Sequence, residues 1–313
     1  MSLDRALELA GAALGVAYPN PTVGAVVVAA DGAVIGEGVT EAYGGRHGEI
    51  VALDSAGESA RGATLYVTME PCTHHGRTPP CVDAIVAAGV TRVVAGCRDP
   101  NQEAAGGLER LRQAGVDAEL DDRFEAHRQN EAWRRWTSLS RPFVTYKVAT
   151  TLDGRVTVPG RRWVTGESSR RLVHELRAAS DAVAVGMGTV RADAPKLDAR
   201  DVAVARQPRR LAFGRGPLPA GSELELHEGH LADELATLAA EGVQSLLLEG
   251  GPTLATAFLE ARLVDKLLVF IAPTLAGDGP QFLGDLSAPT QLLHVSTRPI
   301  GSDLLIEAYL NEL

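Results

Sequence analysis

One histidine, one glutamate and two cysteines in the first 81 residues have the types and spacing of a catalytic zinc site. His47 and Glu49 form an H-x-E motif at the start of an expected helix, and Cys72 and Cys81 follow. One imidazole and two thiolates are ligands that zinc prefers, and a catalytic zinc keeps its fourth position for water. Three protein ligands are therefore the right number for a hydrolytic site.

Glu49 is the residue expected to carry the proton chemistry of this site. A carboxylate two residues from a zinc-binding His47 can accept a proton from water and pass it to a leaving amine. H-x-E followed by a P-C…C segment is the arrangement of zinc deaminases, in which the glutamate is the acid/base and not a ligand. Each motif alone has a structural explanation, because an acid favours a helix N-terminus and cysteines are often buried. Their conjunction favours a zinc deaminase, and Cys97, which has no matching partner, is expected to be simply buried.

The segment between the two cysteines narrows the class. Most zinc deaminases have two residues there, whereas this chain has eight, including His74, His75 and Arg77. This insertion, with P-N-P-T-V-G at residues 19–24 and D-P-N at 99–101, is similar to the deaminase half of the bifunctional riboflavin biosynthesis proteins. The resemblance implies that the ribose phosphate and pyrimidine are held by Asn20, Arg77, Asp99 and Asn101.

Other roles stay open for some of these residues. Asn20 and Asn101 stand beside prolines and could serve turns instead of a ligand, and His74 or His75 could be an alternative metal ligand. The family usually has alanine where this chain has Gly48, for which we expect only a frayed helix start of under about 1 kcal/mol.

The second half of the chain resembles the reductase half of the same proteins, which has a dihydrofolate-reductase-like fold. The turn at residues 249–254 (E-G-G-P-T-L) places a proline at the first position of a helix and exposes N–H groups that a phosphate can approach. G-M-G-T at residues 186–189 follows another expected strand. Each is an ordinary tight turn by itself, but two in one domain favour a nucleotide site.

The resemblance also assigns ligand contacts in this half. It implies that NADPH contacts Ala149, Trp163, Thr189, Asp193, Gly251, Pro252, Thr253 and Leu254. It implies that the substrate contacts Arg177, Leu197, Arg200 and Glu249. The chain departs from the family at residues 161–162, at Ala194 and in a shortened stretch near Gly214. These departures leave open that the reductase half is impaired.

Alternating helices and strands must position these residues, which indicates an α/β protein. We expect a helix over 4–14, a hairpin of strands 23–29 and 34–38, and alternation up to residue 120. The resemblance implies a cytidine-deaminase-like three-layer domain here.

Residues 122–140 show a charged helical pattern, and Arg141-Pro142 interrupts it, because proline ends a helix at the preceding residue. We therefore predict a deaminase domain of residues 1–141 and a reductase domain of residues 142–313.

Composition excludes other classes. The 313 residues carry 40 acidic and 30 basic side chains, a formal charge of −10, whereas a nucleic-acid binder normally has a basic stripe. Charges near the N-terminus exclude a signal peptide, and no uncharged apolar run approaches the roughly 18 residues of a membrane span. Three cysteines indicate a reducing compartment. We expect a cytoplasmic homo-oligomer that acts on a small molecule, with no nucleic-acid or membrane partner.

These observations predict a two-step enzyme with zinc and NADPH as cofactors. It would hydrolytically deaminate 2,5-diamino-6-(5-phosphoribosylamino)pyrimidin-4-one and then reduce the ribosyl group to ribityl phosphate. The alternatives are a deaminase with an impaired or re-purposed reductase half, a deaminase of nucleic-acid bases, and a non-catalytic zinc scaffold. The acidic charge disfavours nucleic acid, and the free Glu49 disfavours a scaffold, because structural zinc is normally closed by four protein ligands.

Overall fold

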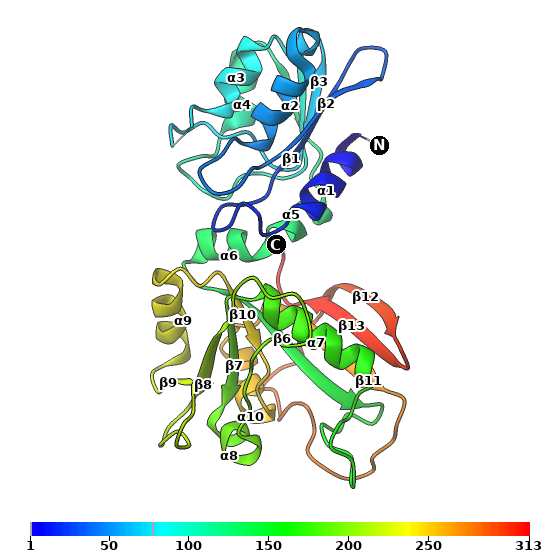
Figure 1. The fold of residues 1–313 in the computed structure, drawn as a ribbon, viewed down its shortest axis with the longest axis vertical. Coiled ribbons are helices and arrows are strands. Elements are labelled where there is room, and N and C mark those ends of the chain that lie inside the picture. The colour runs from blue at the N-terminus through cyan, green and yellow to red at the C-terminus, as the bar shows by residue number, and fades with distance from the viewer. Residues whose placement is uncertain (1, 77) are drawn as a thin grey trace. The chain divides into compact units, whose positions relative to one another are not determined.

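The computed structural model describes residues 2–76 and 78–313. The chain divides between Leu139 and Ser140 into two compact units (Figure 1), each with its own sheet and core. Among the described residues, every helix is too short or too polar to cross a bilayer.

The first unit is a five-stranded sheet between two layers of helices. Side chains alternate across β1: Ala25 and Val27 face the core formed with α2, α3 and α4, and Val26 and Val28 face α1. The unit contains, in order, α1 (Ser2–Ala12), β1 (Gly24–Val28), β2 (Val34–Val39), α2 (Gly48–Ala56), a 3₁₀ turn (Gly57–Ala60), β3 (Thr64–Val67), α3 (Cys81–Ala87), β4 (Arg92–Ala95), α4 (Gly107–Gln113), β5 (Asp117–Leu120), α5 (Phe124–Gln129) and α6 (Glu131–Leu139).

The topology of this sheet gathers the chemistry-bearing residues at one edge. The strand order is β2-β1-β3-β4-β5, with β1 antiparallel to both its neighbours and β3, β4 and β5 parallel. The start of β1 therefore meets the carboxyl ends of β2, β3 and β4: Ala25 lies opposite Val67, and Val67 opposite Ala95. The segments that enter or leave the sheet at this edge carry Asn20, His47, Cys72 and Asp99.

The helical pattern of residues 122–140 forms two helices, α5 and α6, because Asn130 separates them. Asn130 is only 8% exposed, and its amide forms two hydrogen bonds of 2.9 Å with the backbone of Thr22. Thr22 lies just before β1, and the buried amide satisfies its N–H and C=O as a neighbouring strand would. Asn130 thus anchors the segment that carries Asn20.

The second unit is an eight-stranded sheet in the order β12-β13-β11-β6-β10-β7-β8-β9, with α9 and α10 packed on one face and α7 on the other. β11 to β9 are parallel, and β13 and β12 are antiparallel. The unit contains β6 (Phe143–Thr151), α7 (Glu167–Ala179), β7 (Ala182–Gly186), α8 (Met187–Asp193), β8 (Arg209–Phe213), β9 (Glu225–His227), α9 (Leu231–Ala240), β10 (Ser245–Leu248), α10 (Pro252–Glu260), β11 (Lys266–Ala272), β12 (Leu293–Ile300) and β13 (Asp303–Tyr309).

The two outer strands of this sheet, β9 and β12, were not predicted from the sequence. β12 is mostly exposed, so its residues show no apolar alternation, and it contains Pro299, which sheets accept at an edge. β9 has only three residues. The inner parallel strands are continuous apolar runs, which is typical of strands buried on both faces.

Candidate active sites

His47, Cys72 and Cys81 come together at the edge of the first sheet. Their ligand atoms all lie within 4.8 Å of one another, with His47 Nδ1 3.2 Å from Cys81 Sγ and 3.6 Å from Cys72 Sγ. Zn–N and Zn–S bonds of about 2.0 and 2.3 Å in a tetrahedron place nitrogen and sulfur roughly 3.5 Å apart. The three residues therefore fit a zinc ion, with Nδ1 as the nitrogen ligand.

The electrostatics of the cluster favour the thiolate form that zinc requires. Hydrogen bonding from Cys81, aided by His47, lowers the pKa of Cys72 to about 4, and the Cys81 backbone N–H donates to Cys72 Sγ at 3.4 Å. The Cys72 thiolate in turn raises the pKa of His47 and of Cys81. A divalent cation would ionise the second thiol as well, since coordinated thiols are deprotonated.

Glu49 lies in the first turn of α2, two residues after His47, which is the helix N-cap. It is 3% exposed, and its Oε2 atom has no hydrogen-bond partner among the described residues. Burial raises the pKa of its carboxyl to about 7. A buried carboxylate oxygen without a partner, two residues from a metal ligand, is available for water or a substrate amine.

Close packing explains the glycine between these two residues. A Cβ on Gly48 would lie 2.4 Å from the backbone oxygen of Val23, which itself accepts a hydrogen bond from Thr40 N at 2.9 Å. The start of α2 thus rests against the entry to β1. The sequence suggested only a frayed helix start at Gly48. The structure adds that glycine permits this close contact with Val23.

We expect Gly48→Ala to destabilise the first unit by about 1–3 kcal/mol, because the added methyl meets backbone that cannot turn aside. Scanning calorimetry of the zinc-loaded protein measures this. Gly11→Ala is the matched control, since a Cβ there meets only Gln129 Nε2 at 3.7 Å. Equal melting temperatures for the two variants would contradict the packing explanation.

Three of the four residues expected to hold the deaminase substrate, Asn20, Asp99 and Asn101, lie at the same edge of the sheet. Asp99 is partly buried, and its charge helps raise the pKa of His47, which places it near the cluster. Burial raises the pKa of Asp99 itself to about 6. Asn101 accepts a hydrogen bond from the N–H of Glu103 at 3.1 Å, so it also has the turn-forming role. Asn20 is exposed before β1, and Arg77 lies outside the described residues.

One cysteine and two histidines that could have been metal ligands lie outside the cluster of three in the described part of the chain. Cys97 is buried and donates to Thr68 O at 3.4 Å, outside the metal cluster. His74 and His75 do not join the cluster of three among the residues that the structure describes.

In the second unit, a buried triad of charges lies at the carboxyl end of β10. Glu249 receives hydrogen bonds from Arg177 Nε at 2.6 Å and Nη2 at 3.0 Å, and Lys147 Nζ lies 2.7 Å from its Oε2. Burial opposes ionisation of Glu249, but Lys147 and Arg177 outweigh it and lower its pKa to about 2. Arg177 also donates to Asp198 O, and Arg200 pairs with the Asp198 carboxylate at 2.7 Å.

Arg177, Arg200 and Glu249 were expected at the reductase substrate site, and hydrogen bonds to Glu249 or Asp198 connect them. The fourth expected residue, Leu197, directly precedes Asp198 in the chain. Lys147 was not among the expected residues. The signal for it is a lysine in the middle of a buried strand, because burying an ammonium requires a partner.

The two glycine turns of the second unit are neighbours. β7 and β10 are adjacent and parallel, and a Cβ on Gly251 would meet only Thr189 Oγ1, at 3.5 Å. Gly251 is the N-cap of α10, Pro252 follows it, and a Cβ on Gly188 would meet no atom within 4 Å. Open glycine backbone at adjacent helix starts fits the phosphates of a dinucleotide.

The other residues expected to bind NADPH are dispersed around this edge. Ala149 lies near the carboxyl end of β6, and Asp193 is the exposed last residue of α8. Trp163 is 50% exposed, with the guanidinium groups of Arg162 and Arg170 at 4.9 and 5.4 Å from its ring. Thr253 and Leu254 continue the first turn of α10.

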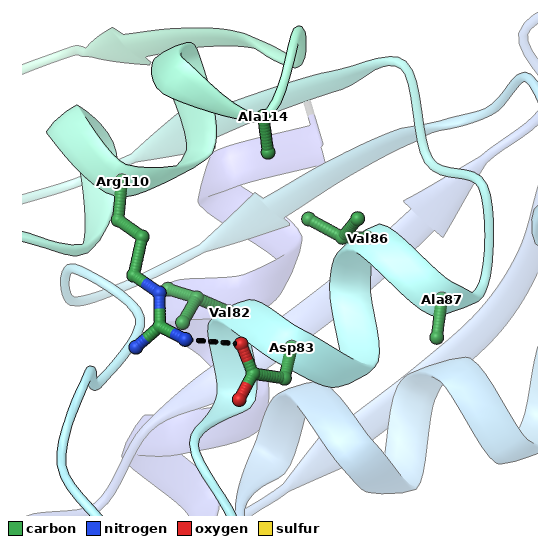
Figure 2. A pocket seen from close by; sticks show the side chains of 6 residues that line it. All are labelled: Val82, Asp83, Val86, Ala87, Arg110 and Ala114. Carbon is green, nitrogen blue, oxygen red and sulfur yellow. Dashed lines mark hydrogen bonds and ion pairs between the residues drawn. The ribbon is translucent and has the colours of Figure 1, made fainter.

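A separate hollow of about 380 Å³ lies between α3 and α4 (Figure 2). Asp83 and Arg110 form an ion pair of 2.6 Å at this hollow. The proposed ligand-binding residues are not part of its lining, which consists of Val82, Asp83, Val86, Ala87, Arg110 and Ala114.

The two halves match two family models. Residues 2–97 match the cytidine and deoxycytidylate deaminase zinc-binding region, and residues 142–306 match the RibD C-terminal domain. The chain is therefore a zinc-type deaminase joined to a RibD-type reductase.

Full-length relatives agree with this class. The riboflavin biosynthesis protein RibD of Aquifex aeolicus is 39% identical, with 96% of this chain and 95% of the relative covered, and RibD of Escherichia coli is 39% identical with 88% of each covered. RibD of Acinetobacter baumannii superposes with a TM-score of 0.84 at 34% identity, covering 99% of this chain and 98% of the other. A Thermotoga maritima deaminase/reductase superposes with a TM-score of 0.83 at 33% identity and the same coverage. The chain belongs to the RibD family of riboflavin biosynthesis proteins.

The α/β class expected from the sequence is confirmed, with a cytidine-deaminase-like first half and a second half that matches the RibD C-terminal domain. The chain is a bifunctional deaminase and reductase of riboflavin biosynthesis, and its cofactors are zinc and NADPH.

Proposed function

We propose that this chain carries out two consecutive reactions on one pyrimidine ribotide. The first is hydrolytic deamination of 2,5-diamino-6-(5-phosphoribosylamino)pyrimidin-4-one, performed by a domain of residues 1–141. The second is reduction of the ribosyl group to ribityl phosphate, performed by a domain of residues 142–313. The observation that carries the proposal is the Oε2 atom of buried Glu49, which has no hydrogen-bond partner in the described part of the chain and lies beside the His47, Cys72 and Cys81 cluster.

In the deamination, His47, Cys72 and Cys81 hold zinc, which supplies Lewis acidity that makes water a nucleophile near neutral pH. Glu49 accepts the proton of the attacking water and returns it to the amine at carbon 2, which leaves as ammonia. Asp99, Asn101, Asn20 and Arg77 bind the pyrimidine and ribose phosphate. Burial of Glu49 suits this role, because an acid/base works best with a pKa near the operating pH.

In the reduction, NADPH supplies the hydride, and the protein aligns donor and acceptor. The adjacent turns at Thr189 and Gly251 hold cofactor phosphate through backbone N–H groups, and Trp163, Ala149 and Asp193 line the rest of the cofactor. Lys147 and Arg177 keep Glu249 ionised and in one orientation, so that its carboxylate can accept hydrogen bonds from sugar hydroxyls. Leu197 and Arg200 complete the substrate contacts.

Two assays on the full chain test this proposal. Ammonia release from the diaminopyrimidine ribotide measures the first reaction, and loss of NADPH absorbance on addition of its deaminated product measures the second. Single-stranded DNA serves as the alternative deaminase substrate. Ammonia from DNA but not from the ribotide would refute the proposed substrate, and a first reaction without a second would leave a deaminase only.

We expect the zinc-loaded protein to contain about one zinc per chain and Cys81→Ala to lose it, because two remaining ligands do not make a stable site. Metal analysis after dialysis measures this. Cys97→Ala is the matched control, since it removes another buried thiol that lies outside the cluster. Full zinc in Cys81→Ala would refute the ligand assignment.

We also propose that the enzyme is cytoplasmic and homo-oligomeric and that it needs no nucleic-acid or membrane partner. None of the three cysteines forms a disulfide, which is typical of a reducing compartment. Sedimentation of the purified protein tests the oligomeric state.

A further inference from the structure

Glu70 is a buried carboxylate that neither proposed reaction uses. It lies between the end of β3 and Cys72, and it is 3% exposed. Burying an ionised carboxylate is costly unless hydrogen bonds replace its water. Its contacts therefore indicate what it does.

The contacts of Glu70 all lead to the segment that follows β4. Its Oε2 accepts a hydrogen bond from the backbone N–H of Asp99 at 3.3 Å, and its Oε1 accepts one from the N–H of Leu108 at 3.0 Å. Arg98 Nη1 lies 3.6 Å from Oε1, and the Glu70 backbone N–H donates to Cys97 O at 2.8 Å. One side chain thus binds the beginning of this segment and the start of α4.

The hydrogen bonds continue from Glu70 into the residues expected to hold the substrate. Asp99 Oδ1 accepts a hydrogen bond from the N–H of Asn101 at 2.8 Å, and Asn101 Oδ1 accepts one from the N–H of Glu103 at 3.1 Å. The backbone position of Asp99, which Glu70 sets, therefore determines where both side chains lie.

A second set of hydrogen bonds holds the same segment from the other side of the zinc ligand Cys72. Thr73 N donates to Ala104 O at 2.9 Å, and Thr73 Oγ1 donates to Ala105 O at 3.0 Å. Residues on both sides of Cys72 thus hold residues 97–108 at two separate points. Because Cys72 is a zinc ligand in the proposed site, the substrate segment is tied directly to the metal site.

We propose that Glu70 is a positioning residue of the deaminase, which sets residues 99–101 relative to the zinc ligand Cys72 and so places the pyrimidine ribotide over the metal. This inference rests on the proposed deaminase function. A carboxylate suits the position, because the N–H groups of Asp99 and Leu108 both require an acceptor. Glutamine offers one acceptor oxygen and turns an NH₂ group toward the other donor.

The test is the steady-state rate of ammonia release by full-length, zinc-loaded Glu70→Gln, measured against the concentration of the diaminopyrimidine ribotide. We expect KM to rise about tenfold, because the variant loses a hydrogen bond to a charged acceptor. That hydrogen bond helps to hold the substrate-binding residues in position. We expect kcat to stay within about threefold, since the chemical groups remain in place. Zinc content stays at the parent level.

Glu109→Gln is the matched control, because Glu109 is an exposed residue of α4 that pairs with Arg112; its KM stays at the parent value. Thr73→Val removes the hydrogen bond from Thr73 Oγ1 to the same segment and raises KM in the same way. If Glu70→Gln does not fold, Thr73→Val is the variant that tests the positioning role.

The outcomes separate the two proposals. No ammonia from the parent enzyme means that the proposed function is wrong. An active parent with an unchanged KM in Glu70→Gln, or with zinc loss as the only defect, overturns the positioning role. If Glu70→Gln cannot be obtained, an unchanged KM in Thr73→Val overturns it.

Discussion

Replacing Glu49 by glutamine should lower ammonia release by about 10²–10⁴-fold, the usual contribution of a general acid or base, and leave zinc bound. Glutamine has nearly the same shape, and Oε2 makes no hydrogen bond within the described part of the chain that the change would break. Glu49 is not one of the three clustered metal-binding residues. The loss should therefore fall on kcat, measured with saturating ribotide.

The matched control for this prediction is Glu58→Gln, which changes an exposed glutamate in the 3₁₀ turn after α2 and should leave both activities unchanged. NADPH oxidation with the deaminated substrate should persist in Glu49→Gln. Deamination within about twofold of the parent rate would show that Glu49 is not the proton carrier, since such a residue contributes far more.

The zinc ligands were predictable from the sequence because few residue types bind zinc and few spacings combine with H-x-E. The structure adds what spacing cannot contain: His47 turns Nδ1 toward both sulfurs. It also shows why Gly48 stands where the family usually has alanine. That reason is a contact with Val23, a residue 25 positions away, and periodicity carries no information on such contacts.

The residues that the sequence analysis missed act through partners distant in the chain. Glu70 binds the backbone of Asp99 and Leu108, and Lys147 binds Glu249. A charged residue in an apolar run signals a buried partner but does not name it. Asn130 is a similar case, because its hydrogen bonds to Thr22 interrupt a sequence whose local preference is one helix.

The inner strands could be predicted as apolar runs, yet the gathering of the site residues depends on the order of these strands in the sheet. In the second unit, the turns after β7 and β10 are adjacent because these strands pair, although Gly251 lies 62 positions after Thr189. The sequence indicated two glycine turns, and only the topology makes them one surface. This adjacency makes Gly251 the most selective point at which to test the reductase half.

Gly251→Val should abolish NADPH oxidation while leaving ammonia release and zinc content at parent levels. A Cβ at Gly251 meets only Thr189 Oγ1, at an ordinary contact distance of 3.5 Å, and the residue has φ −66° and ψ 174°, which any residue adopts. The fold should therefore accept a side chain there. A phosphate that approaches the backbone N–H groups at the start of α10 would not, because the valine methyl groups occupy its place.

A graded series makes this test specific. Gly251→Ala should weaken NADPH binding and Gly251→Val should remove it, in fluorescence titrations with the cofactor, while the melting temperature of both variants stays near that of the parent. Deamination is the internal control, because the first unit has its own sheet and core. Parent-like NADPH affinity in Gly251→Val would mean that the cofactor phosphate lies elsewhere. A parent enzyme that binds no NADPH at millimolar concentration would mean that the departures at Ala194 and near Gly214 have cost this half its activity.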